Sequence, residues 1–126
     1  MLRLAFVELA VDDWHGALQF YRDTLGLKLS HLDPARRWAL FHPPQGGSGV
    51  AVFARDPTRP EIALTFQCQD LDAAARELAA RGAEPLGPPT TSEEGYRLLR
   101  LRDPAGRRLN LFEYTRWSGH EGSARL

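Results

Sequence analysis

The chain has 126 residues, of which 43% are hydrophobic and 25% charged, a composition typical of an ordinary globular domain and not of a disordered segment. Its 16 basic and 16 acidic residues cancel, so the chain has no net positive field to attract nucleic acids or anionic membranes, and a nucleic-acid partner is not expected. Its one cysteine, Cys68, excludes an intrachain disulfide and a cysteine zinc cluster.

The first half of the chain predicts a strand, a helix and three further strands. Residues 4–11 are rich in β-favouring side chains, and Asp13 is a suitable N-cap for a helix over residues 14–25. Side chains that repeat at intervals of three and four predict its packing face: Ala17, Phe20, Tyr21 and Thr24. Gly26 follows at the place where the helix should end. Strands are expected over residues 27–32, 37–42 and 49–54.

The second half repeats this order after a rigid connector, residues 56–60, that contains two prolines. A strand is expected over 61–68, and a helix over 71–80 begins at Asp70 and stops before Gly82. Strands over 83–86, 96–101 and 108–114 complete the pattern, with a loop over 87–95 and a turn over 103–106. We therefore expect a single domain made of two tandem βαβββ repeats, residues 3–55 and 61–114, followed by a loose tail over 115–126 that contains Trp117.

The start of the chain runs directly into a strand pattern and lacks the features of a signal peptide. No apolar run approaches the roughly 20 residues that span a membrane. These observations predict a cytoplasmic protein that is not inserted in a membrane.

Two segments carry a resemblance to a known family. They are Val11-Asp12-Asp13 leading to residues 17–26, and the turn over 103–106 leading to residues 109–113. In these the chain resembles the vicinal oxygen chelate superfamily, which includes glyoxalase I, bleomycin resistance proteins, fosfomycin resistance enzymes and extradiol dioxygenases. The resemblance implies an α+β fold in which an incompletely closed, mixed β-sheet barrel surrounds a central cleft with helices outside, and it implies a homodimer.

The resemblance also implies four metal-ligand positions, one on the first and one on the last strand of each repeat. In this chain they fall on Phe6, on Ala63, on the strand 49–54 without any carboxylate or imidazole, and on the neutral amide of Asn110. The histidines show no ligand spacing that would replace this set: His15, His31, His42 and His120. We therefore expect no metal and no other cofactor.

Strand alternation singles out Glu8. If Val7, Leu9 and Val11 face the helices, then Phe6 and Glu8 point into the cleft. An inward carboxylate suits a general acid or base, because an apolar site disfavours its ionised form. The alternatives are that Glu8 pairs with an inward arginine or lies at a wet rim.

On the last strand the same alternation turns Asn110 and Phe112 inward and Glu113 to the opposite face, where a surface or rim position is expected. Asn110 either orients a ligand or makes a structural hydrogen bond within the sheet. Trp38, His42 and Tyr96 are further candidates to line the cleft, with packing as their alternative role.

These residues favour metal-independent binding or sequestration of a small organic ligand. The alternative is an enzyme, such as a lyase, isomerase, hydrolase or dioxygenase-like protein, that uses Glu8 as general acid or base while Asn110 and His42 orient the substrate. A third alternative is a structural or regulatory dimer without a ligand. No phosphate-binding loop precedes a helix, so no nucleotide cofactor is implied.

Overall fold

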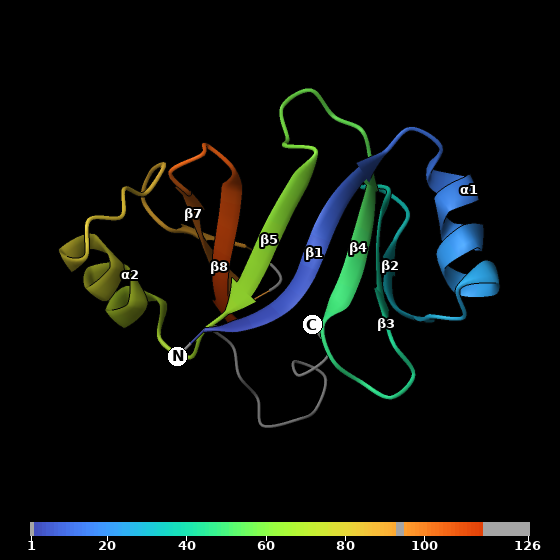
Figure 1. Cartoon of the computed structure of the whole chain (residues 1–126), viewed down its shortest axis with the longest axis horizontal. Coiled ribbons are helices and arrows are strands. Elements are labelled where there is room, and N and C mark those ends of the chain that lie inside the picture. The colour runs from blue at the N-terminus through green and yellow to red at the C-terminus, as the bar shows by residue number, and fades with distance from the viewer. Residues whose placement is uncertain (1, 93–94, 115–126) are drawn as a thin grey trace. The chain divides into compact units, whose positions relative to one another are not determined.

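A computed structural model describes residues 2–92 and 95–114 of the chain. They form two compact units that nearly coincide with the expected repeats (Figure 1). The first unit is Ala5–Ala63, and the second contains residues 2–4 together with the described residues after Ala63. Each unit contains one α-helix with its own strands, so the predicted α+β fold of two βαβββ repeats is confirmed.

The first repeat contains β1 (Arg3–Val11), α1 (Trp14–Gln19), β2 (Lys28–Asp33), β3 (Trp38–His42) and β4 (Gly49–Ala54). Its strands lie in the order β2-β3-β4-β1. β1 runs parallel to β4, and the two other pairings are antiparallel. The mixed sheet expected from the sequence is therefore present, because the connection from β1 through α1, β2 and β3 returns the chain beside its first strand.

The second repeat contains β5 (Ile62–Gln67), α2 (Leu71–Ala80), β6 (Thr90–Thr91), β7 (Tyr96–Arg102) and β8 (Arg108–Tyr114). Its strands lie in the order β5-β8-β7-β6. β2 and β6 each have a strand neighbour on one side only, so the sheet is not closed, as predicted.

Equivalent aspartates begin the two helices. The Asp13 carboxylate accepts a hydrogen bond from the backbone N–H of Gly16 at 2.9 Å, and that of Asp70 accepts one from Ala73 at 3.0 Å. Both interactions satisfy donors that have no partner within the first helical turn, which is the role that the sequence predicts for them.

The predicted first helix is wrong in its second half. After Gln19 the chain continues as a π-helical turn, η1 (Phe20–Thr24), in which the N–H of Leu25 donates to the carbonyl of Phe20. The wider turn shifts the side chains around the axis, so Ala17 and Tyr21 pack on the sheet while Phe20 is 47% exposed. Thr24 is exposed as well and does not belong to the packing face.

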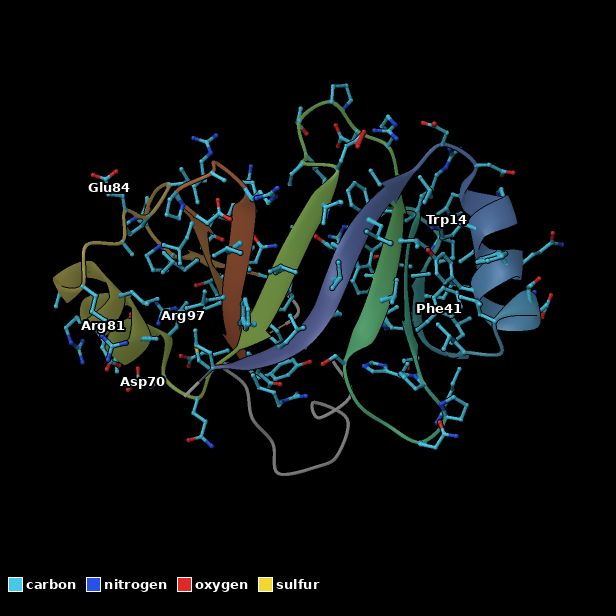
Figure 2. The ribbon with its side chains drawn as sticks, in the orientation of Figure 1. Trp14, Phe41, Asp70, Arg81, Glu84 and Arg97 are labelled. Atoms are coloured by element: carbon cyan, nitrogen blue, oxygen red, sulfur yellow. The ribbon has the colours of Figure 1, made fainter. Side chains whose placement is uncertain are left out.

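Each repeat has its own hydrophobic core between helix and strands. In the first, Trp14 packs with Phe41 and Val52, and Figure 2 shows the Trp14 and Phe41 side chains on the α1 side of the strands. In the second, Leu71 of α2 packs with Leu99 and Leu111. Apolar residues on alternate strand positions are thus turned toward the helix, as expected from a period of two.

One strand of the second repeat lies later in the chain than predicted. Residues 83–86 form no strand: Pro85 makes an isolated bridge to Leu101, and the N–H of Leu86 donates to Arg100. The strand beside β7 is Thr90–Thr91, within the predicted loop. Two consecutive prolines, Pro88 and Pro89, lack N–H donors and separate these two contacts with β7. The expectations for Trp117, His120 and the tail lie outside the described residues.

Candidate functional site

The strands of the first repeat present a second face, opposite α1, that carries most of the predicted site residues. Val11, Val50 and Val52 belong to the α1 side. By alternation and register, the other side carries five residues of β1, β3 and β4, which we call the first-repeat face: Phe6, Glu8, Trp38, His42 and Phe53. Four of these five were predicted from the sequence, and Phe53 was missed because its strand reads as uniformly apolar.

Glu8 is held by two donors on one oxygen. Its Oε2 accepts a hydrogen bond from Trp38 Nε1 at 2.8 Å and one from Arg59 Nη2 at 2.9 Å, and its side chain is 12% exposed. Of the two alternatives to a free base, pairing with an arginine is therefore the arrangement found. Among the described residues no donor reaches Oε1, so one edge of the carboxylate remains open for a further hydrogen bond.

Arg59 is a member of this site that sequence reasoning missed. Its guanidinium lies 3.9 Å from the centre of the Phe53 ring, a cation–π contact, while it donates to Glu8. The connector that carries it is fixed by Asp56, whose carboxylate accepts from the backbone N–H and hydroxyl of Thr58, both at 2.9 Å. The backbone hydrogen bond from Thr58 is the main cause that lowers the pKa of Asp56.

Aromatic rings lie beside the two residues that hold the carboxylate. The Trp38 ring makes edge contacts with Phe6 and with His31 of β2, at 5.8 Å between ring centres in both cases. Phe6 and Phe53 are 5% and 2% exposed. The two hydrogen bonds, from side chains that themselves pack against aromatic rings, hold Glu8 in one orientation.

His42 is seated on the same face by two small residues. Its Nδ1 lies 2.6 Å from the hydroxyl of Ser30, at a bulge in β2. Its ring occupies the space beside Gly49, where an added Cβ would lie 2.9 Å from His42 Nε2 and 2.6 Å from the carbonyl oxygen of Phe41. A larger residue at position 49 would therefore displace the imidazole.

The other predicted site residues lie in the second repeat. By register with β7, the side of β8 opposite α2 carries Asn110 and Phe112, and β7 adds Tyr96; we call these three, with Tyr114, the second-repeat face. Phe112 is 2% exposed and contacts both Tyr96 and Tyr114 edge-on. The two sets of predicted residues thus belong to separate compact units.

Asn110 makes the structural contact that was its alternative role. Its Nδ2 donates to the hydroxyl of Thr65 at 3.3 Å, and Thr65 is 3% exposed. Glu113 points to the opposite face, as expected, but it is not a simple surface residue. Its Oε1 accepts a hydrogen bond from the backbone N–H of Leu71 and so helps to cap α2.

The described residues contain no group of three or more His, Cys, Asp or Glu side chains that is arranged to hold a metal ion. Phe6 and Ala63, two of the four ligand positions, carry hydrocarbon side chains that cannot coordinate a cation. Within residues 2–92 and 95–114, no helix is long and apolar enough to span a membrane.

The family model described as Glyoxalase/Bleomycin resistance protein/Dioxygenase superfamily matches residues 3–111. Among curated proteins, the chain is 27% identical over 120 residues to the uncharacterised protein YraH of Bacillus subtilis (strain 168). That alignment covers 82% of this chain and 91% of YraH.

Solved structures share the fold at low sequence identity. Methylmalonyl-CoA epimerase from Mycobacterium tuberculosis superposes with a TM-score of 0.74 at 24% identity, covering 89% of this chain and 87% of that one. A variant of the Streptomyces coelicolor methylmalonyl-CoA epimerase, in complex with 2-nitronate-propionyl-CoA, gives 0.68 at 21% identity, covering 89% and 96%.

Proposed function

This chain belongs to the Glyoxalase/Bleomycin resistance protein/Dioxygenase superfamily, and from that premise we propose that it binds a small organic molecule without a metal ion, using the first-repeat face. The observation that carries the proposal is the Glu8 carboxylate. It is 12% exposed, held on one oxygen by Trp38 and Arg59, and open on the other among the described residues.

The chemistry of this face favours a ligand with an apolar body and a hydrogen-bond donor. The rings of Phe6 and Trp38 supply apolar contact area, and Oε1 of Glu8 supplies an acceptor whose direction is already fixed. Because two donors hold Oε2, the carboxylate loses little freedom when a ligand binds. Solved structures with this fold include complexes with small organic molecules, methylmalonyl-CoA among them, which is consistent with such a ligand.

The experiment is a thermal-shift screen of small metabolites, followed by calorimetric titration of any compound that raises the melting temperature. Three variants are compared with the wild type: Glu8→Gln, Trp38→Phe and, as control, Glu84→Gln, an exposed carboxylate in the loop after α2 (Figure 2). We expect Glu8→Gln to weaken binding about 10-fold, the loss of one charge-assisted hydrogen bond. Trp38→Phe should weaken it less, and Glu84→Gln should leave it unchanged.

The proposal fails if no compound stabilises the protein. It also fails if Glu8→Gln binds a compound as tightly as the control Glu84→Gln does. The ligand recovered after incubation should be chemically unchanged by NMR, as binding without turnover requires.

The same open oxygen also favours the second candidate, an enzyme in which Glu8 Oε1 moves a proton of the substrate while Trp38 and Arg59 hold the carboxylate. Incubating the compound in D2O separates the two functions. Exchange of a carbon-bound hydrogen that the wild type catalyses and Glu8→Gln does not, with binding retained, identifies the enzyme. The cytoplasmic location and the homodimer stay predictions, and analytical ultracentrifugation tests the second.

A further inference from the structure

The β7–β8 hairpin carries arginines that neither the predicted site nor the proposed function includes. We propose that Arg100, Arg102 and Arg108, here called the arginine cluster, bind a phosphate or diphosphate group of a small organic ligand. This inference goes beyond the function proposed for Glu8, because it rests on different residues in the other compact unit.

The three arginines share one side of the hairpin. Leu99 and Leu101 of β7 pack against α2, so Arg100 and Arg102 point to the opposite side. Cross-strand register places Arg102 directly opposite Arg108, and it places Arg100 opposite Asn110, one pair further along. The cluster therefore continues the second-repeat face.

Two like charges opposite each other in antiparallel strands destabilise a sheet. Here Arg102 faces Arg108, and neither Arg100 nor Arg102 has an ion pair or hydrogen bond from its side chain to any described residue. The nearest acidic residue in sequence is Asp103, whose carboxylate accepts from the backbone N–H of Arg107 in the turn. Arg100 and Arg102, which lack an anionic partner among the described residues, are therefore available to an external anion.

The ligand class follows from the side chains. Guanidinium groups bind phosphate oxygens through paired, charge-assisted hydrogen bonds, and two neighbouring arginines match the several oxygens of a diphosphate. At the other end of the same face Tyr96 and Tyr114 pack on the buried Phe112 ring and are themselves only partly buried, so they provide aromatic surface for an organic body. A nucleic acid is disfavoured because the whole chain has no net charge.

The test uses sodium pyrophosphate as probe and the full-length chain. Melting temperature is measured against pyrophosphate concentration for the wild type, Arg102→Gln, Arg100→Gln and the control Arg81→Gln. Arg81 is an exposed arginine at the end of α2 that pairs with Glu77, so its removal takes the same charge from the same unit (Figure 2). Sodium chloride at equal ionic strength measures general screening.

We expect pyrophosphate to raise the melting temperature of the wild type and of Arg81→Gln well above the effect of the matched chloride solution. Arg102→Gln should melt about 1–4 °C higher than the wild type without the anion, because the opposed pair is relieved. Its affinity for pyrophosphate should fall about 10-fold, and that of Arg100→Gln by a similar factor.

The inference is overturned if chloride reproduces the pyrophosphate effect, or if Arg81→Gln loses the effect as fully as Arg102→Gln does. It is also overturned if Arg102→Gln melts lower than the wild type and keeps its affinity. None of these results bears on Glu8, so the proposed function and the arginine cluster succeed or fail separately.

Discussion

The first-repeat and second-repeat faces belong to repeats with the same βαβββ order, but their charged side chains are paired in different ways. On the first, a carboxylate and a guanidinium of opposite sign meet at 2.9 Å beside Phe53. On the second, Arg102 stands opposite Arg108, and no described carboxylate pairs with Arg100 or Arg102. The two repeats therefore share their backbone pattern and their helix-side core, while the polar side chains of each face have separate roles.

The largest effect is expected where the two faces are alike. Phe53 belongs to the first-repeat face and Phe112 to the second-repeat face, and each is 2% exposed. Phe53→Ala and Phe112→Ala should each lower the free energy of unfolding by about 3–5 kcal/mol, because each leaves a cavity in a packed region. Urea denaturation measures both. A loss below 1 kcal/mol in only one variant would show that the surroundings of that ring relax around the cavity. The two faces would then differ in how tightly they are packed.

The next largest effect concerns the Glu8–Arg59 ion pair, which only the first-repeat face contains among the described residues. Arg59→Gln leaves the Glu8 carboxylate, 12% exposed, with only the Trp38 donor. We expect a loss of about 1–2 kcal/mol, below the range for fully buried pairs because Arg59 is itself 36% exposed. The double variant Glu8→Gln/Arg59→Gln should recover part of this loss, since no unpaired charge remains. If urea denaturation shows the single variant to be as stable as the wild type, the ion pair does not organise the first-repeat face.

Local sequence signals predicted the framework on which both faces depend. Asp13 and Asp70 were identified as helix caps, and period-two alternation placed Glu8 and Asn110 on the sides opposite their helices. Such features depend on neighbouring residues, so the sequence displays them directly. The resemblance to the superfamily was visible in the sequence for the same reason, because the segments that carry it consist of packing residues and turns that are close together in the chain.

The contacts that give the site its chemistry were not predictable in this way. Arg59 reaches Glu8 across 51 positions of the chain and from a connector, so no spacing rule links the two residues. The π-helical turn that exposes Phe20 and the displacement of a strand to Thr90–Thr91 depend on hydrogen-bond competition within the fold. Strand alternation predicts the side of the sheet on which a side chain lies, whereas tertiary packing decides which distant residue it contacts.

The smallest effect is expected within β7, where one arginine has an acidic partner and the other two have none among the described residues. Arg97 lies on the α2 side of its strand (Figure 2) and donates two hydrogen bonds of 3.0 Å to the carboxylate of Asp72. The hydrogen bond from Arg97 is the main cause that lowers the pKa of Asp72. Because the folded pKa lies below the unfolded value of about 4, this contribution to stability is complete above pH 4 and is lost as pH falls through the folded pKa.

Arg97→Gln should therefore lose stability less steeply than the wild type between about pH 4 and pH 2.5, because its Asp72 has a pKa closer to that of the unfolded chain. Urea midpoints measured from pH 7 to pH 2.5 give the two slopes. Arg102→Gln is the matched control: Arg102 has no carboxylate partner among the described residues, so its removal should shift the whole curve without changing its acid slope. Equal slopes for the wild type and Arg97→Gln would mean that the Arg97–Asp72 pair does not persist in solution, and β7 would then carry three unpaired arginines instead of two.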